Sequence, residues 1–317
     1  MLVLLTGVAA EAAGTTYFVN NGATCSDGNA GTSSSAPLCT ITAAAKKAVS
    51  GDTVQVAAGS YSEQVTAVAS GVTYQGSAQA EVVGSAAVAD TAWTQIGTSS
   101  WGVQPGWPSS PAQVSSGGTA LTRAASAAAV DTTPNSWFWD SSKAPATLLV
   151  NAGGTAPSAV TVSWTYGFLV RGLSGVTIDG FAVTGHTGAG INLDTGTSGS
   201  TVTNTTVSGS GGYGISDNGG SNNTITGVHT TGNTSIGIRV LNSTGDVVSA
   251  STSNNNGFHG VSVQGGSGNT VRDVTAFANL KPGTRVATGI DVSSSSSGVL
   301  VERNTVYGND DSGIEIY

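Results

Sequence analysis

Charged residues are scarce in this sequence of 317 residues, which makes the places where they gather informative. The chain has 18 acidic and 10 basic residues, and four of the acids stand near its C-terminal end: Asp291, Asp310, Asp311 and Glu315. Carboxylate oxygens are preferred ligands of Ca²⁺, a hard cation that takes about six to eight oxygen atoms. If the chain brings these four side chains together, they predict a Ca²⁺ site. The alternative is a solvated edge on which the carboxylates mildly repel one another.

Three basic residues could act beside these acids: Lys281, Arg285 and Arg239. Arginine stays charged, whereas a lysine can exchange a proton more readily. Lys281 is therefore the predicted proton acceptor, and the two arginines are predicted to complete the catalytic group by binding oxygen atoms of an acidic substrate. His259 is a candidate for contact with the same substrate. The other two histidines fall in different positions of the repeat described next, so a three-histidine metal site is not expected.

A glycine followed by alternating apolar residues recurs along the second half of the chain. These landmark glycines are 23 to 29 residues apart: Gly190, Gly214, Gly237, Gly260, Gly289 and Gly313. A repeat of this length holds two or three short strands but cannot bury its own apolar face, so successive repeats must stack. The sequence therefore predicts an all-β protein, a parallel β-helix. A β-sandwich, the alternative, would show hairpin turns and no fixed period.

Stacked repeats place equivalent residues directly above one another, because side chains alternate between the two faces of each strand. The residue after each landmark glycine is predicted to line the interior, in the file Ile191, Ile215, Ile238, Val261, Ile290 and Ile314. The next residue is predicted to form an outward row: Asn192, Ser216, Arg239, Ser262, Asp291 and Glu315. Neighbours in this row should stand ~4.8 Å apart, with Asp291 beside Glu315. The longest repeat carries a predicted projecting loop at 279–285, which contains Lys281 and Arg285.

The composition limits the classes of function. Gly, Ser and Thr dominate, 38 % of the residues are apolar and 9 % are charged. This composition excludes a coiled coil and leaves enough apolar residues for a folded core. A net charge of −8 disfavours a nucleic-acid partner. Beyond the first residues, no stretch approaches the ~18 apolar residues of a membrane span. We expect a monomer with neither a nucleic-acid partner nor a membrane span.

Both ends of the chain and its two cysteines bear on where the protein acts. Residues 1–12 are predicted to be a secretory signal peptide, since the apolar run at 2–10 is followed by a small-x-small cleavage pattern. The usual basic start of such a peptide is missing, and a buried first strand is the alternative. In a secreted, extracellular chain, Cys25 and Cys39 are predicted to form a disulfide, with a metal pair or free thiols as alternatives. The sequence stops at Tyr317 within a landmark strand, which predicts further turns.

The period fails between residues 90 and 166, and all six tryptophans lie in this part of the chain: Trp93, Trp101, Trp107, Trp137, Trp139 and Trp164. Short alternating runs there predict antiparallel strands. The expected organisation is an N-terminal cap with the first turns at 13–89, a Trp-rich β insertion at 90–166 and the remaining turns at 167–317. Trp101 and Trp139 are candidates for stacking on the sugar rings of a substrate. The alternative is that the tryptophans form the core of the insertion.

The N-terminal part adds a resemblance to a known group of proteins. It runs Tyr17-Phe18-Val19, then Ser26-Asp27-Gly28-Asn29, then Gly51-Asp52-Thr53-Val54-Gln55-Val56. With the repeat, this pattern resembles the pectate-lyase-like superfamily of secreted right-handed parallel β-helix proteins. The resemblance implies a right-handed solenoid whose first end is plugged by a short amphipathic helix. Residues 42–50 are the predicted helix, with a glycine just beyond its end. The superfamily contains lyases, hydrolases, epimerases and adhesins, so its fold does not settle a function.

A shorter motif carries a second resemblance. The run Asp310-Asp311-Ser312-Gly313-Ile314-Glu315 is similar to the calcium-binding stretch of family 9 polysaccharide lyases. The resemblance implies that Asp310, Asp311 and Glu315 hold Ca²⁺ and that Lys281 takes the proton. The run departs from that family by one residue in spacing and by Glu in place of Asp.

Three hypotheses for function follow. The first is a secreted, Ca²⁺-dependent polysaccharide lyase that cleaves a uronic-acid polysaccharide by β-elimination. The second is a glycoside hydrolase on the same scaffold that uses Asp291 with Glu315 or Asp310 as acid and base, because a row spacing of ~5 Å fits a retaining pair. The third is a non-catalytic β-helix that binds carbohydrate or covers a cell surface.

Overall fold

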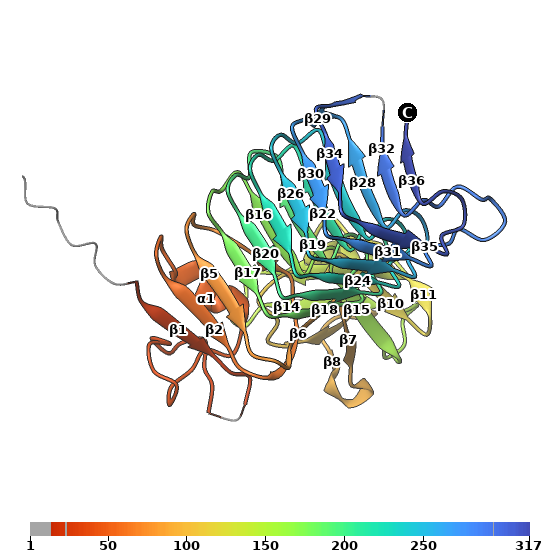
Figure 1. Ribbon diagram of the computed structural model, residues 1–317. Coiled ribbons are helices and arrows are strands. Elements are labelled where there is room, and N and C mark those ends of the chain that lie inside the picture. Colours follow the sequence, from red (N-terminus) through yellow and green to blue (C-terminus); the bar gives the residue numbers. More distant parts are fainter. Residues whose placement is uncertain (1–13, 23, 294) are drawn as a thin grey trace, which may run out of the picture.

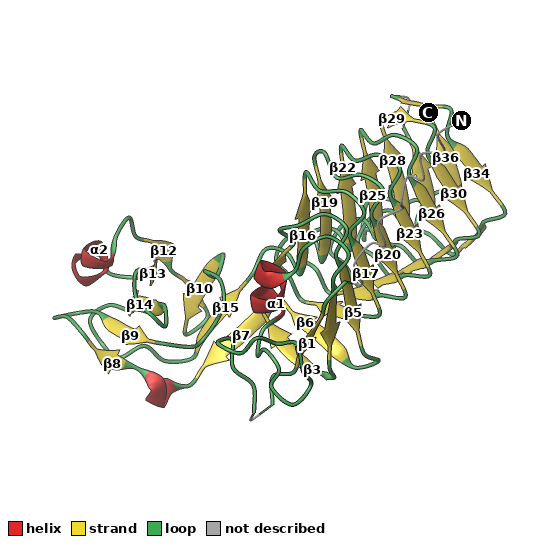
Figure 2. Cartoon of the chain, turned by 90° about the vertical axis from the view of Figure 1, so that its left-hand side faces the viewer, coloured by secondary structure: helices red, strands yellow, loops and turns green. Residues whose placement is uncertain are grey.

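The protein, seen in a computed structural model, is described at residues 14–22, 24–293 and 295–317. The predicted signal peptide at 1–12 lies outside the described residues. Most of the chain winds into a tube with three walls of parallel strands, and a smaller β-rich insertion projects beside its N-terminal end (Figures 1 and 2). The predicted parallel β-helix is therefore confirmed.

Each wall is a sheet that receives one short strand from each turn. Sheet A contains β1 (Thr16–Val19), β2 (Thr53–Val56), β5 (Thr73–Gly76), β17 (Thr177–Asp179), β20 (Thr201–Thr203), β23 (Thr224–Thr226), β26 (Val247–Ser249), β30 (Thr270–Arg272) and β34 (Leu300–Glu302). Sheet B contains β3 (Gly59–Ser62), β6 (Ala80–Val83), β18 (Ala182–Thr184), β21 (Thr206–Ser208), β24 (His229–Thr231), β27 (Thr252–Asn254), β31 (Thr275–Phe277) and β35 (Thr305–Tyr307). Sheet C contains β4 (Val65–Thr66), β16 (Phe168–Arg171), β19 (Ile191–Asp194), β22 (Ile215–Asn218), β25 (Ile238–Leu241), β28 (Val261–Gln264), β32 (Ile290–Val292) and β36 (Ile314–Ile316). A pair of two-residue strands, β29 (Gly266–Ser267) and β33 (Ser296–Ser297), pairs at one corner.

The landmark strands of the sequence are the strands of sheet C. Their first residues pair in the predicted register, from Ile191 through Ile215, Ile238, Val261 and Ile290 to Ile314. All are fully buried except Ile314 in the last described turn, which is 45 % exposed. The apolar interior runs without a break from the N-terminal turns to β32, so burial of these side chains drives the stacking of the repeats.

The landmark glycines are required because the chain approaches the next turn closely at this corner. A Cβ atom on Gly190 would overlap the side chain of Val207, and one on Gly237 would overlap the Ser253 hydroxyl. Any larger residue at these positions would push apart turns that pack at interior density. The glycine therefore recurs because there is no space for a side chain at this corner.

A file of buried asparagines joins successive turns at the corner that follows sheet B. The Nδ2 group of Asn233 donates to Oδ1 of Asn256 at 2.9 Å, Asn256 donates to Asn279 at 2.9 Å, and Asn279 donates to Asn309 at 2.9 Å. Each Oδ1 atom in this asparagine file also accepts the backbone N–H of the preceding member. The file therefore satisfies backbone donors that a turn buried in the tube would otherwise leave unpaired.

A second polar file lies at the corner that follows sheet C, and one of its members is acidic. The backbone N–H of Asn223 donates to Asp246, and that of Asp246 donates to Asn269. Asp217 lies beside this file and accepts hydrogen bonds from Asn223 and Ser243. Both aspartates are almost completely buried. Burial, and then the neighbouring Asp246, raises the pKa of Asp217 to about 8, so the pair holds a proton at neutral pH.

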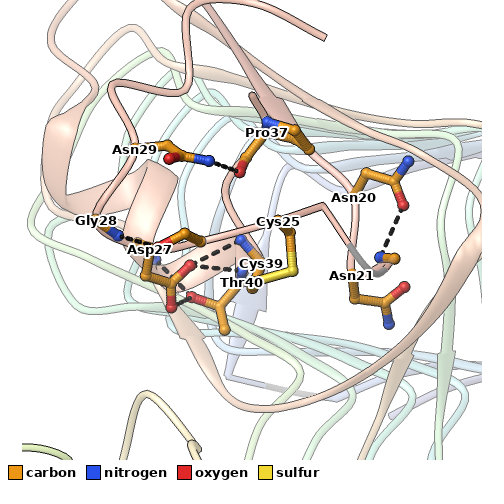
Figure 3. The surroundings of a disulfide bond; sticks show 12 residues. Asn20, Asn21, Cys25, Asp27, Gly28, Asn29, Pro37, Cys39 and Thr40 are labelled. Atoms are coloured by element: carbon orange, nitrogen blue, oxygen red, sulfur yellow. Dashed lines mark hydrogen bonds between the residues drawn. A yellow bond between two sulfur atoms is a disulfide. The ribbon is translucent and has the colours of Figure 1, made fainter. Parts of the chain in front are cut away.

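The N-terminal end of the tube is covered by α1 (Ile41–Lys47) and a disulfide-linked loop. Thr40 caps the helix, since its hydroxyl accepts the N–H of Ala43 at 3.1 Å. The helix begins one residue before the predicted range and ends three residues earlier. It stops at Ala48 because this residue has extended backbone angles. Figure 3 shows the predicted Cys25–Cys39 disulfide, with Asp27 accepting the backbone N–H groups of Cys39 and Thr40.

The insertion consists of two small sheets and two short helices. The first sheet, sheet D, contains β7 (Ser85–Val88), β15 (Val160–Ser163), β10 (Gln113–Ser116) and β11 (Thr119–Ala120). The second, sheet E, contains β8 (Thr94–Gln95), β9 (Trp101–Val103), β14 (Thr147–Asn151), β13 (Ser136–Asp140) and β12 (Thr122–Arg123). The helices are the 3₁₀ helix η1 (Asp90–Ala92) and α2 (Ala127–Thr132). All of these pairings are antiparallel except that of β12 with β13. Strand β7 begins before the predicted boundary at residue 90.

The tryptophans form the core of this insertion. Trp139 is 8 % exposed and stacks on Trp107, and Trp101 packs against the same cluster with a buried indole nitrogen. Trp139 is therefore buried in the core of the insertion, whereas Trp101 is only partly buried, and its contact with a sugar ring stays a prediction. The insertion needs these large side chains because its small sheets have no other apolar core.

Candidate functional site

The outward residues of sheet C form the row that the sequence predicts. Asn192 pairs with Ser216, Arg239 with Ser262, and Asp291 with Glu315 in one continuous register. We call these six residues the sheet C row. Asp291 and Glu315 are thus neighbours on adjacent turns, ~4.8 Å apart along the sheet. Arg239 lies two turns from Asp291.

Several members of the row are buried although they point away from the tube interior. Asp291 and Ser262 are completely buried, and Ser216 is 3 % exposed. The Ser262 hydroxyl donates to Oδ2 of Asp291 at 2.7 Å. Oδ1 of Asp291 has no hydrogen-bond partner among the described residues. A buried carboxylate with one free oxygen is costly unless another group compensates it.

His259 and Thr288 connect Asp291 to Glu315. The Nε2 atom of His259 lies 4.0 Å from Oδ2 of Asp291, and its Nδ1 atom accepts the backbone N–H of Thr288 at 3.1 Å. The Thr288 hydroxyl donates to Glu315 at 3.1 Å. Because Nδ1 is an acceptor, a neutral His259 carries its proton on Nε2, facing Asp291. His259 is therefore placed to stabilise Asp291, with no ring nitrogen left to accept a substrate proton.

The charges of this cluster act on His259 in opposite directions. Burial lowers the pKa of His259. The carboxylates of Asp291 and Glu315 raise the pKa of this ring, and the Lys281 ammonium lowers it. The net shift is downward, so the ring is neutral at physiological pH. The Asp291 carboxylate in turn raises the pKa of the Tyr317 phenol, with smaller contributions from burial and from Glu315. Tyr317 therefore also lies at this cluster.

Lys281 reaches the cluster from the projecting loop. Its Nζ atom lies 5.0 Å from the centre of the Phe258 ring, and that centre is 3.7 Å from the centre of the His259 ring. The ring contact places the amine near His259, whose pKa it lowers. Arg285, on the same exposed loop, makes no hydrogen bond or ion pair with any residue that the structure describes. The structure thus brings together Lys281, His259, Asp291 and Glu315, but it leaves Arg285 without a contact to them.

Arg239 lines a separate groove farther along the same face. Its guanidinium lies 4.7 Å from the centre of the Tyr213 ring, and its Nε atom donates to Gln264 at 3.4 Å. A cavity of about 480 Å³ lies elsewhere at the N-terminal end, whereas the groove beside Arg239 measures about 300 Å³ and includes Tyr166 and Asn192. A positive group over an aromatic floor suits a sugar carboxylate.

The four carboxylates predicted to hold Ca²⁺ do not form one group, although Asp291 and Glu315 are neighbours. Within the described part of the chain, no three His, Cys, Asp or Glu side chains are grouped so that they could bind a metal ion. The backbone N–H groups of Asp310 and Asp311 bond to Asn279 and Ala287, which fixes both residues in the corner before β36. Asp291 is completely buried within the row. The described residues therefore form no group of three or more carboxylates, and Ca²⁺ binding stays a prediction from the sequence.

The sequence could not identify all the residues around this cluster. Phe258, Thr288 and Tyr317 contact or influence it, yet apolar, hydroxyl and phenol side chains are common in every corner of the chain. One signal was available for the first two. Each lies within two residues of a landmark glycine, and positions just before these glycines line the face of sheet C.

Comparisons with known proteins support the fold. The model of a family described as right-handed β-helix region matches residues 166–317, and that of a family of unknown function, DUF1565, matches residues 23–92. No curated protein matches the chain.

Three solved structures have similar folds. Pectate lyase Pel9A has a TM-score of 0.59 at 14 % identity, covering 96 % of this chain and 68 % of its own. XylC in complex with xylose has a TM-score of 0.52 at 14 % identity, covering 93 % of this chain and 66 % of its own. A rhamnogalacturonan lyase has a TM-score of 0.50 at 14 % identity, covering 90 % and 62 %. The chain thus spans about two thirds of the length of these structures, and at such identities the similarity shows the fold alone.

Proposed function

We propose that this right-handed parallel β-helix protein, which has the pectate-lyase-like fold, is a secreted enzyme that cleaves a uronic-acid polysaccharide by β-elimination. The observation that carries the proposal is the position of Lys281, an exposed amine held over Phe258 beside the buried His259–Asp291 pair. Two of the proteins with similar folds are a pectate lyase and a rhamnogalacturonan lyase. The disulfide and the finding that no described helix is long and apolar enough to cross a membrane are compatible with secretion.

The chemistry of β-elimination assigns a task to each exposed cation on this face. A base removes the proton from the carbon next to the uronate carboxylate, the bond to the leaving sugar oxygen breaks, and a carbon–carbon double bond forms. The leaving oxygen takes a proton from water. Lys281, in its neutral form, is the proposed proton acceptor, since His259 has no free ring nitrogen. Arg285 and Arg239 are the proposed partners of substrate carboxylates.

The acidic residues have a supporting task in this proposal. Asp291 is completely buried, so it orients His259 and does not touch the polysaccharide. This burial also weakens the hydrolase hypothesis, because one of its two carboxylates could not reach a glycosidic bond. Ca²⁺ dependence stays a separate prediction from the sequence, and no step of the proposed reaction passes through the ion.

The direct test is the appearance of unsaturated products. The protein is incubated with pectate, alginate and other uronate polymers, with added Ca²⁺ or with EDTA, and near-ultraviolet absorbance is followed. We expect absorbance with at least one polymer and at least a hundredfold lower rate for Lys281→Ala. Lys46→Ala, which changes an exposed lysine of α1, is the matched control and should keep the wild-type rate.

Two outcomes would count against the proposal. New reducing ends without the absorbance would indicate hydrolysis, and an unchanged rate for Lys281→Ala would remove the proposed base.

A further inference from the structure

The insertion contains a cavity of about 810 Å³ whose lining shares no residue with the sheet C row. Sheet E forms its floor. Along β14, Leu148 and Val150 face the tryptophan core, while Leu149 and Thr147 point to the opposite side and line the cavity. Helix α2 covers part of this second face, where Asn151 donates to the Val130 carbonyl at 2.9 Å. The rest of the face is open.

Gly102 keeps the floor of the cavity low. It pairs with Leu149 across the sheet, and both residues line the cavity together with Ile96. Ile96 is 55 % exposed, although it is a large apolar residue. A Cβ atom at position 102 would stand 3.3–3.4 Å from the side chains of Thr147, Ile96 and Leu149, so a larger residue would crowd the floor. The floor is therefore an apolar surface that a small ring could cover.

Fixed polar groups stand around this apolar floor. Oδ1 of Asp131 accepts the backbone N–H of Ser99 at 2.7 Å and the Ser100 hydroxyl at 2.9 Å. Oδ1 of Asp140 accepts the Ser142 hydroxyl and backbone N–H, at 2.5 and 3.1 Å. These hydrogen bonds lower the pKa of both carboxyl groups, and Lys143 contributes to the shift at Asp140. Both carboxylates are thus ionised and held in place, and their Oδ2 atoms make no hydrogen bond with any residue that the structure describes.

We propose that this cavity binds an uncharged saccharide. Sugar rings combine an apolar C–H face with hydroxyl donors, which matches an apolar floor bordered by carboxylate acceptors. The volume lies within the range of about 300–1,000 Å³ typical of small-molecule sites. Two carboxylates and one ammonium group leave the cavity with a net negative charge, which disfavours a uronate.

The two sites of the molecule therefore recognise opposite kinds of sugar. The loop beside the sheet C row presents two exposed cations, Lys281 and Arg285, to an acidic sugar, whereas the cavity of the insertion has two carboxylates and only one cation, Lys143. This inference goes beyond the proposed cleavage and does not depend on it. Binding of a neutral saccharide by the insertion would stand even if the tube proved to have no lyase activity.

The test uses neutral and acidic oligosaccharides as probes. Oligomers of glucose, galactose, mannose and xylose, together with oligogalacturonate, are screened against the full chain on an array, and positives are titrated by calorimetry. Gly102→Val fills the floor, and its new Cβ would meet only the side-chain ends of Thr147, Ile96 and Leu149, at 3.3–3.4 Å. Asp140→Ala removes one acceptor. Gln113→Ala, on an exposed position of β10, is the matched control.

We expect at least one neutral oligomer to bind the wild-type protein. Its affinity should fall at least tenfold in Gly102→Val and in Asp140→Ala, and should stay unchanged in Gln113→Ala and Lys281→Ala. Thermal unfolding checks that each variant is folded. If Gly102→Val does not fold, Asp140→Ala still tests the cavity. The inference is overturned if no neutral oligomer binds, if both cavity variants bind as well as wild type, or if the cavity variants lose only oligogalacturonate.

Discussion

The asparagine file and the sheet C row both run along the tube, and they differ in how strictly they repeat. The asparagine file places the same residue at each of four successive turns, and every amide bonds to the next. The sheet C row changes at almost every turn, from amide to hydroxyl to guanidinium to carboxylate. A side chain that only joins turns must meet the same geometry each time, so it repeats. A side chain that meets a substrate has no such constraint, so the uneven file is where chemistry is expected.

The largest expected effect is a loss of stability on disrupting the asparagine file. Asn256→Ala should destabilise the protein by about 3–5 kcal/mol, because it leaves several buried partners unpaired at once. These include the backbone N–H of Asn233, and the side-chain amide of Asn233 loses its 2.9 Å acceptor at the same time. Chemical unfolding measures the loss. Thr206→Ala, on an exposed position of β21, should change stability by less than about 0.5 kcal/mol. Equal effects in the two variants would contradict a structural role for the file.

A smaller effect should follow from a change in the second polar file, which contains Asn223, Asp246 and Asn269: replacing the aspartate by asparagine makes the file uniform. Asp246 stands between Asn223 and Asn269, and it is buried beside Asp217. The folded-state pKa of Asp217 is raised from 3.8 to about 8. The stability due to its protonation is therefore complete below about pH 4 and is lost as the pH rises through 8. Asp246→Asn supplies a neutral donor to Asp217 and should lessen this loss.

The measurement is thermal unfolding of wild type and Asp246→Asn at several pH values. We expect the midpoint of the variant to be about 3–8 °C higher near pH 8–9 and to differ less near pH 5. Asp273→Asn changes a carboxylate that is paired with Arg303 at the surface, and it should not reduce the alkaline loss. A pH dependence that is the same in wild type and Asp246→Asn would show that the buried pair does not govern alkaline stability.

The sequence was sufficient to predict the features that repeat from turn to turn and those that depend on neighbouring residues. Burial of one apolar residue per turn fixes the register, so the neighbours Asp291 and Glu315 followed from the positions of Ile290 and Ile314. The disulfide and the capping helix followed from local signals. These features depend on contacts that recur or that lie close in sequence.

The features that do not repeat from turn to turn could not be predicted in the same way. The burial of Asp291 depends on the corners that pack around it, and the positions of Asp310 and Asp311 depend on backbone hydrogen bonds to Asn279 and Ala287. The contact of Lys281 with Phe258 joins a loop to a corner of the turn before it. The pattern of residues alone contains none of this three-dimensional information. The tryptophans were ambiguous for the same reason, because an indole serves a core and a sugar site equally well.

The histidines allow the central claim to be tested directly. The chain has three histidines, and they lie in different places: His259 beside the sheet C row, His229 on sheet B, and His186 buried in the corner between β18 and β19. Selective ¹³C labelling of the histidine rings therefore gives one NMR signal for each place. An acidic oligosaccharide such as oligogalacturonate should shift the signal of His259 and leave the other two unchanged. A shift of His229 or His186 with His259 unchanged, or no shift at saturating concentration, would contradict the assignment of the uneven row as the substrate site.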